Sequence, residues 1–133
     1  MSREPVRVVA AVVEADGKFL LAKRPANKSQ GGFWEFPGGK VEPEEAAQTA
    51  LARELAEELG ARNVEVGDLV GVAEHDYGAR VVRIEAYWVK CELTSLRCLE
   101  HDEIGWFRTV EFNALPLAPA DVFLAELVGQ ASG

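Results

Sequence analysis

The sequence predicts a mixed α/β fold, α+β in type, in which a mixed β-sheet carries helices on its faces. Apolar, β-branched runs alternate with two segments of strong helix formers, in the order strands, helix, strands, helix. No repeat, low-complexity segment or linker interrupts this order. Because the chain has 133 residues, 48% of them hydrophobic, we expect one compact domain over residues 1–133.

The N-terminal part is predicted to begin with two strands. Apolar runs at residues 6–14 and 18–23 flank the turn residues Asp16 and Gly17, so we expect adjacent antiparallel strands. Residues 24–40 are rich in Gly, Pro, Asn and Ser, which predicts an irregular segment with a short strand at 34–36. Loops of this length in a compact domain are often functional.

The central helix is expected at residues 44–59. This segment contains neither Gly nor Pro, and Gly60 follows it as a C-terminal cap. Its apolar residues recur at helical spacing, so one face should pack on the sheet: Ala47, Ala50, Leu51, Leu55 and Leu59.

The C-terminal half is predicted to contain three strands and a closing helix. The strands are expected at residues 64–73, 80–93 and 104–107, with a turn near Tyr77 and Gly78. Pro119 suits a helix start, and apolar residues follow at helical spacing: Val122, Phe123, Leu124, Leu127 and Val128.

The composition limits the partners. The 22 acidic and 14 basic residues give a formal charge of −8, which disfavours binding to a nucleic-acid backbone, so an anionic substrate would need metal cations or local arginines. No apolar run is long enough to span a membrane and the N-terminus does not resemble a signal peptide, so we expect a cytoplasmic location without membrane partners.

Cys91 and Cys98 lack metal or redox spacing and are expected to be reduced, while His75 and His101 are expected at the surface. Monomer and homodimer both remain open.

Clustered carboxylates distinguish the central helix. Helical spacing brings Glu54, Glu57 and Glu58 into one sector, and Arg53 is the only basic residue between residues 41 and 60. Such a cluster suits a hard divalent cation, although a solvated acidic face is the alternative. Gly38 and Gly39, shortly before the helix, would let the backbone approach a ligand closely, and Arg53 could bridge carboxylates that include Glu45.

Residues 39–61, GKVEPEEAAQTALARELAEELGA, resemble the Nudix box, with Ala61 as the one departure, where a bulkier aliphatic residue is usual. The resemblance implies an α/β/α sandwich in a single Nudix domain. It also implies Mg²⁺-dependent hydrolysis of a nucleoside diphosphate linked to another moiety, with Mn²⁺ as a possible substitute. In the family's roles, Mg²⁺ is held by Glu54, Glu57, Glu58 and a backbone carbonyl of Gly38 or Gly39. Glu54, Arg53, Glu45 and Glu57 are the catalytic candidates, with Arg53 orienting the carboxylates and Glu45 assisting.

Outside this box, the chain resembles the MutT-like branch, and within it the CTP pyrophosphohydrolases and oxidised-nucleotide pyrophosphohydrolases. By position, Arg24, Phe36 and Asp121 match nucleotide-contacting residues, and Glu100 matches an additional metal ligand that Asp102 or Glu103 could replace. Each of these residues has a plainer alternative. Arg24 could be a surface arginine and Phe36 a core aromatic ring. Asp121 could be an acid in the first turn of a helix, and Glu100 part of a solvated acidic turn.

The expected reaction converts a nucleoside triphosphate to the monophosphate and pyrophosphate. An ionised Asp121 would accept a hydrogen bond from an amino group such as cytosine N4, which favours (d)CTP, whereas a protonated Asp121 would admit modified or oxidised dNTPs. One alternative is a hydrolase of dinucleotides or ADP-ribose. The proline-containing signatures that follow the box in the ADP-ribose and NADH hydrolases are missing from this sequence, whereas Tyr77 lies roughly where diadenosine hydrolases carry a tyrosine. The other is a non-catalytic nucleotide-sensing domain, which the complete set of carboxylates disfavours.

Overall fold

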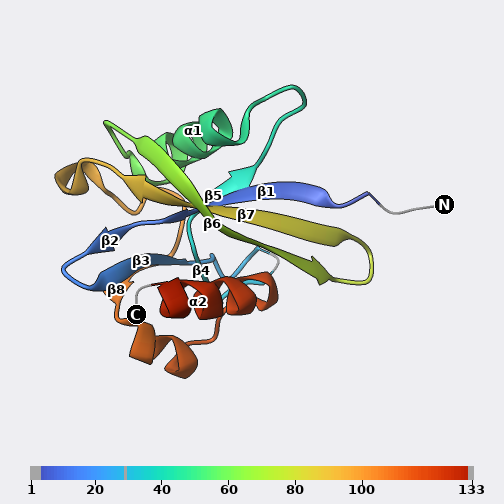
Figure 1. Cartoon of the computed structure of the whole chain (residues 1–133). Coiled ribbons are helices and arrows are strands. Elements are labelled where there is room, and N and C mark those ends of the chain that lie inside the picture. Colours follow the sequence, from blue (N-terminus) through green and yellow to red (C-terminus); the bar gives the residue numbers. More distant parts are fainter. Residues whose placement is uncertain (1–3, 29, 132–133) are drawn as a thin grey trace.

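The computed structural model describes residues 4–28 and 30–131. In chain order, the elements are β1 (Val6–Val12), β2 (Glu14–Ala15), β3 (Lys18–Lys23), β4 (Trp34–Glu35), β5 (Gly38–Lys40), α1 (Ala47–Leu59), β6 (Glu65–Asp76), β7 (Val81–Lys90), η1 (Leu93–Ser95), β8 (Glu103–Phe107), η2 (Thr109–Ala114) and α2 (Pro119–Ala131). The predicted order of strands and helices is confirmed, and Figure 1 shows α1 and α2 on opposite sides of the strands.

The strands form two sheets. The first has the order β5-β1-β7-β6 and is mixed, because β1 and β7 are parallel while the other pairs are antiparallel. The second joins β2, β3 and β4, and β8 pairs with β3. The expected mixed sheet with helices on its faces is therefore confirmed, and the remaining strands form a second sheet that the sequence pattern did not predict.

The division of the N-terminal run explains this difference. Residues 6–14 were expected to form one strand beside residues 18–23, but the run is interrupted at Val13, and only β2 pairs with β3. The turn between them has positive φ at Asp16 (52°) and Gly17 (78°), as the pattern predicts. Because β1 instead pairs with β5 and β7, distant segments of the chain decide its sheet.

Helix α1 begins at Ala47, three residues after the expected start at residue 44. Glu44 has φ 64°, a left-handed conformation that cannot continue a right-handed helix. The helix ends as predicted, because Gly60 is left-handed at φ 64° and its N–H donates to Ala56 O at 3.0 Å. All of the predicted apolar contact residues are buried: Ala47, Ala50, Leu51, Leu55 and Leu59.

Helix α2 begins at Pro119 as predicted and packs on β6 and β7. Leu124 and Val128 are buried, but Val122 and Phe123 are 45% and 49% exposed, so only part of the predicted apolar set faces the core. No helix in residues 4–28 and 30–131 is both long and apolar enough to cross a membrane.

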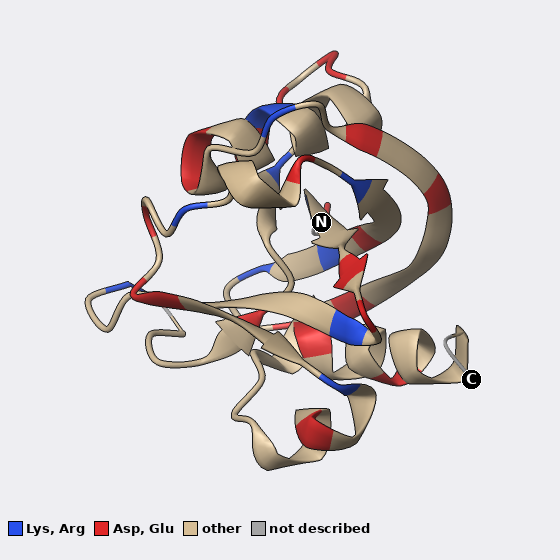
Figure 2. Ribbon diagram, turned by 90° about the vertical axis from the view of Figure 1, so that its left-hand side faces the viewer, with Lys and Arg blue, Asp and Glu red and all other residues tan. Residues whose placement is uncertain are grey.

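The β6–β7 hairpin has its turn at Tyr77 and Gly78 as predicted, with φ 89° at Gly78. Its strands are offset from the expected 64–73 and 80–93 ranges, because β6 runs on to Asp76 and β7 ends at Lys90. Cys91 and Cys98 are free thiols, as expected. In Figure 2, basic residues are scattered among acidic ones along the ribbon.

Candidate functional site

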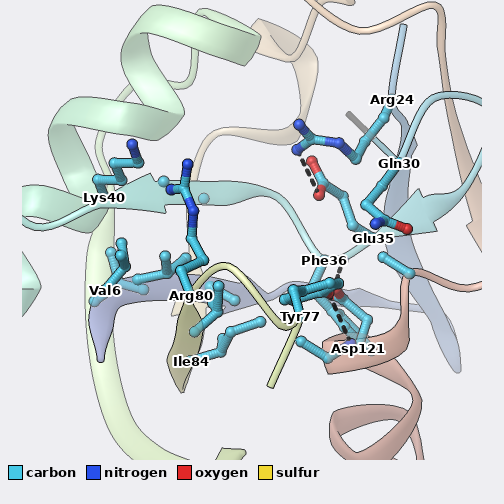
Figure 3. Close-up of a pocket in the computed structure, with 18 of the residues that line it drawn as sticks. Val6, Arg24, Gln30, Glu35, Phe36, Lys40, Tyr77, Arg80, Ile84 and Asp121 are labelled. Carbon is cyan, nitrogen blue, oxygen red and sulfur yellow. Dashed lines mark hydrogen bonds and ion pairs between the residues drawn. The ribbon is translucent and has the colours of Figure 1, made fainter. Parts of the chain in front are cut away.

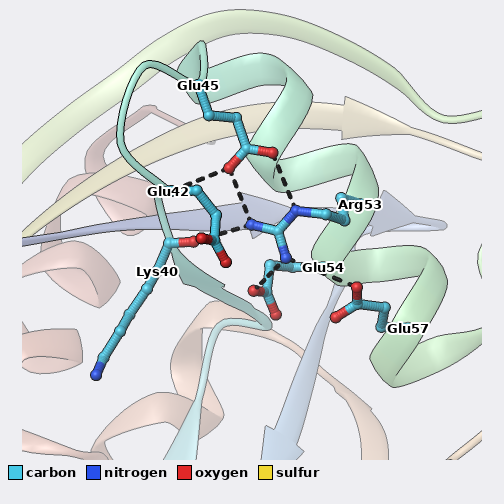
Figure 4. A network of polar contacts seen from close by, with 6 residues as sticks. All are labelled: Lys40, Glu42, Glu45, Arg53, Glu54 and Glu57. Atoms are coloured by element: carbon cyan, nitrogen blue, oxygen red, sulfur yellow. Dashed lines mark hydrogen bonds and ion pairs between the residues drawn. The ribbon is translucent and has the colours of Figure 1, made fainter.

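Arg53 organises the polar face of α1 (Figure 4). Its Nε donates to Glu45 Oε2 at 3.0 Å and its Nη2 to Glu45 Oε1 at 2.9 Å, a two-pronged geometry suited to a guanidinium group. Nη1 donates to Glu54 Oε1 at 3.0 Å and lies 3.7 Å from Glu57 Oε1. These bonds raise the pKa of Arg53 and lower that of Glu45, so both groups stay charged near neutral pH.

The two glycines of β5 have no room for side chains. A Cβ on Gly38 would collide with the Val9 carbonyl, and one on Gly39 would collide with the carboxylate of Glu54. Arg53 also reaches this strand, since its Nη2 donates to the Lys40 carbonyl at 3.2 Å. Glycine at position 39 therefore lets the Glu54 carboxylate lie directly against the backbone of β5.

Glu58 is the carboxyl group of α1 whose pKa is most strongly shifted. It is 8% exposed, and burial raises its pKa to about 9, assisted by a hydrogen bond with Glu54 and by the charges of Glu54, Glu35 and Glu100. The Glu57 side chain, in contrast, is 55% exposed. Several carboxylates thus repel one another around Glu58, and a divalent cation would relieve this repulsion.

The carboxylates do not form a finished cage. Within residues 4–28 and 30–131, no three His, Cys, Asp or Glu side chains are arranged so that they could hold a metal ion. Mg²⁺ does not need such a cage, because it commonly keeps several waters and binds through one or two carboxylates plus substrate phosphate oxygens. The oxygen-only donors therefore fit a hard divalent cation such as Mg²⁺.

Glu100 is the acid of its loop that acts on α1. It is exposed, and its charge contributes to the raised pKa of Glu58. Asp102 instead accepts a hydrogen bond from the Ala26 N–H at 3.2 Å, and Glu103 pairs with Lys23 in the β3–β8 register. Of these three acids, Glu100 is the one whose charge acts on Glu58.

A pocket of about 470 Å³ lies beside β5 (Figure 3). Gly38 and Gly39 line it on the side of α1, and its other lining residues include all three predicted nucleotide contacts: Arg24, Phe36 and Asp121. Tyr77, which the sequence singled out for diadenosine substrates, also lines the pocket, together with four polar residues that sequence reasoning did not assign: Gln30, Glu35, Lys40 and Arg80. Because Gly39 contacts both the pocket and Glu54, the pocket adjoins the carboxylates of α1.

Arg24 and Asp121 differ in their surroundings. Arg24 Nη1 donates to Glu35 Oε1 at 3.1 Å, so the arginine lies in the pocket next to an acid rather than on an open surface. Asp121 is 4% exposed, and its Oδ1 accepts a hydrogen bond from the Phe36 N–H at 2.9 Å. Burial, aided by the charge of Glu35, raises the pKa of Asp121 well above its usual range, while Phe36 and Arg24 oppose the shift.

The ring and the backbone of Phe36 have separate contacts. The side chain is in the core, 3% exposed, with its ring edge-on to Phe112 at 6.0 Å between centroids. The backbone N–H points instead to Asp121. The core alternative therefore holds for the ring, and Phe36 contributes to the pocket by orienting the Asp121 carboxyl group.

The expectation that His101 lies at the surface was wrong. Its side chain is 5% exposed, and Nε2 lies 3.0 Å from Glu35 Oε2 and 3.6 Å from Glu58 Oε1. The sequence held one signal for Glu35, a charged residue between Trp34 and Phe36 in a short strand, where alternation points it away from the rings. For His101 there was no comparable signal, because its burial comes from folding of the surrounding loop.

The chain is similar to proteins of one family. The NUDIX domain family matches residues 8–126. The CTP pyrophosphohydrolase of Escherichia coli strain K12 is 45% identical over 121 residues, or 91% of this chain and 89% of that protein. The 8-oxo-dGTP diphosphatase of Proteus vulgaris is 37% identical over 98 residues, or 71% and 87%. The solution structure of the E. coli ORF135 protein has a TM-score of 0.85 at 42% identity, covering 96% of this chain and 91% of that one.

Proposed function

The chain belongs to the NUDIX domain family and is a MutT-like nucleoside triphosphate pyrophosphohydrolase, and from this premise we propose that it uses Mg²⁺ to hydrolyse (d)CTP or a modified dNTP. The products are the nucleoside monophosphate and pyrophosphate. Residues 1–133 act as a single domain in this proposal, since the family match extends over residues 8–126.

One observation carries the proposal: the pocket and the carboxylates of α1 share Gly39. Arg24 and Asp121 line the pocket with Gly39, and the Glu54 carboxylate lies against that glycine. A nucleotide whose base meets Asp121 can therefore direct its phosphates toward α1. This arrangement gives the base and the phosphates separate, adjoining sites.

We assign the metal to Glu54, Glu57 and Glu58, with a backbone carbonyl of Gly38 or Gly39 and with Glu100 as an additional ligand. When bound, Mg²⁺ would neutralise phosphate charge and make a bound water more acidic, with Mn²⁺ as a possible substitute. The oxygen donors and the repulsion around Glu58 support this assignment.

The remaining steps belong to side chains of α1 and the loop before it. Glu54 and Glu57 are the proposed acceptors for the proton of the attacking water. Arg53 holds Glu54 in place, and the paired contact with Glu45 fixes the guanidinium group in turn. No covalent intermediate is required for this in-line attack on phosphorus.

Asp121 is the proposed base-reading group. Its raised pKa favours the neutral carboxyl form, which can both donate and accept hydrogen bonds. The sequence connected this neutral form with modified or oxidised dNTPs, but cytosine also fits it, with N3 as acceptor and the N4 amino group as donor. A neutral carboxyl group also suits other bases with an adjacent donor and acceptor, which keeps modified dNTPs within the proposal.

The test is pyrophosphate release measured across canonical and modified NTPs and dNTPs, ADP-ribose, NADH and diadenosine polyphosphates, with Mg²⁺, Mn²⁺ or a chelator. We expect the largest kcat/KM with (d)CTP or a modified dNTP, and loss of activity on chelation. Turnover that survives chelation would remove the metal from the mechanism. A larger kcat/KM with a dinucleotide than with any NTP or dNTP would overturn the proposed substrate class in favour of the dinucleotide alternative.

A further inference from the structure

His101 is a buried polar side chain that the proposed mechanism does not use. It lies on the loop between η1 and β8, and its Nε2 faces Glu35 in the pocket and Glu58 on α1. Glu35 in turn pairs with Arg24 through its other oxygen. A continuous series of polar contacts therefore runs from the pocket through His101 to the carboxylates of α1.

The surroundings of the imidazole select one tautomer. Nδ1 is buried and has no hydrogen-bond partner among the described residues, whereas Nε2 lies 3.0 Å from Glu35 Oε2. A proton on Nδ1 would be a buried donor without an acceptor, and the Nε2 lone pair would then face a carboxylate. The geometry assigns the ring proton to Nε2, which donates to Glu35.

The loop that carries His101 is hydrogen-bonded both to the end of α1 and to the end of β3 beside the pocket. The N–H groups of Arg97 and Leu99 donate to the carbonyls of Leu59 at 2.7 Å and Glu58 at 3.2 Å, at the end of α1. The Asp102 N–H donates to Lys23 O at 3.0 Å, next to Arg24. His101 thus lies between two backbone anchors, one on the helix and one at the edge of the pocket.

We propose that His101 is a positioning residue that couples the nucleotide pocket to the metal-binding carboxylates by holding Glu35 and Glu58 in one mutual arrangement. This role rests on the proposed function. Ordering of Glu35 by a bound nucleotide then favours the arrangement of Glu58 that binds a cation, and the reverse holds because coupling between two sites is reciprocal. A residue with this role affects both binding events, whereas Arg24 affects mainly the nucleotide.

The kinetic test uses three substitutions that separate packing from hydrogen bonding. Glutamine places an amide N–H near the position of Nε2, asparagine places one near Nδ1, and leucine has neither. H101L and H101N should raise both KM and the half-saturating Mg²⁺ concentration about tenfold, since residues that support metal ligands commonly contribute this much, while H101Q stays near wild type. Thermal unfolding of each variant reports whether it folds.

The second test does not depend on turnover. The chain has two histidines, so ¹⁵N NMR of the imidazoles can be assigned with H75Q, which is also the matched histidine control. We expect the Nε2–H tautomer for His101, and a change in its ¹⁵N shifts on addition of Mg²⁺ alone and of CMP alone. His75 should not respond to Mg²⁺, although CMP can shift it because its ring contacts the pocket residue Tyr77. Direct Mn²⁺ titration should show weaker binding to H101N than to H101Q.

Several results would overturn the role of His101: an Nδ1–H tautomer, equal behaviour of H101Q and H101N, or a shift in KM without a shift in metal affinity. If H101L does not fold, the glutamine and asparagine pair decides the matter. If the wild type releases no pyrophosphate from any nucleotide, the proposed function fails, while the NMR and Mn²⁺ titrations still test the coupling.

Discussion

Glu45, in the loop before α1, and Asp121, in the pocket, are both carboxyl groups, yet folding moves their pKa values in opposite directions. Glu45, paired with Arg53, has a lowered pKa and stays ionised, whereas buried Asp121 has a raised pKa. Charge pairing dominates at Glu45, whereas desolvation dominates at Asp121 and also at Glu58 of α1. The difference teaches that the surroundings of a carboxyl group, and not its type, decide whether it is ionised.

The largest effect is expected from Glu54→Gln, which keeps the shape of the side chain but removes its charge. Pyrophosphate release should fall about 10³-fold, because removing a positioned proton acceptor typically costs about 10²–10⁴-fold. Circular dichroism should show an unchanged fold. Glu126→Gln, on the exposed side of α2, is the matched control and should retain wild-type kcat. Equal rates for the two variants would exclude Glu54 from the chemistry.

Gly39→Ala tests the contact between the two regions. The added Cβ would collide with the Glu54 carboxylate, so kcat/KM should fall by about 10–100-fold, as expected for displacing a metal ligand. Gly129→Ala is the control, because a Cβ there meets nothing within 4 Å in helix α2. That variant should keep its activity and gain about 0.5–1 kcal/mol of unfolding free energy, measured by urea denaturation. Full activity of Gly39→Ala would mean that Glu54 functions from another position.

Arg53→Lys removes some of the hydrogen bonds that hold Glu45 and Glu54 but keeps the positive charge at position 53. A lysine cannot make the paired contact with Glu45 while also bonding to Glu54, so kcat should fall about tenfold or more. The melting temperature should change little, because partly exposed ion pairs contribute little to stability. A large loss of stability with unchanged kcat would assign Arg53 a purely structural role.

Asp121→Asn sharpens the comparison from the side of the pocket, with a smaller effect on rate. A carboxyl pKa that is raised in the folded state contributes stability at low pH, and this stability is lost as pH rises from the usual aspartate range toward the folded pKa. Asparagine cannot ionise, so the variant should gain stability relative to wild type over this pH interval, as measured by chemical denaturation at stepped pH.

The same substitution should change base preference more than metal affinity. Asparagine has no acidic proton, but its amide can still donate to one partner and accept from another. We therefore expect several-fold changes in relative kcat/KM among bases, with the Mg²⁺ dependence unchanged. Identical selectivity in the two proteins would remove Asp121 from base recognition.

The sequence by itself determined the features that depend on neighbours along the chain. The spacing of Glu54, Glu57 and Glu58, the left-handed cap at Gly60 and the Pro119 helix start all follow from local backbone geometry. A prediction of such a feature holds as soon as the segment is helical, whatever the rest of the chain does. The role of each carboxylate in the reaction remains a prediction, since it depends on ligands.

Tertiary structure decided the features that depend on contacts between distant segments. It divided the strands between two sheets, buried His101 between Glu35 and Glu58, and raised the pKa of Asp121 beside the backbone of Phe36. Burial and electrostatic coupling arise from the three-dimensional arrangement, and local sequence patterns do not encode them. For this reason the reaction class could be predicted from one helix, whereas the environment of Asp121 required the fold.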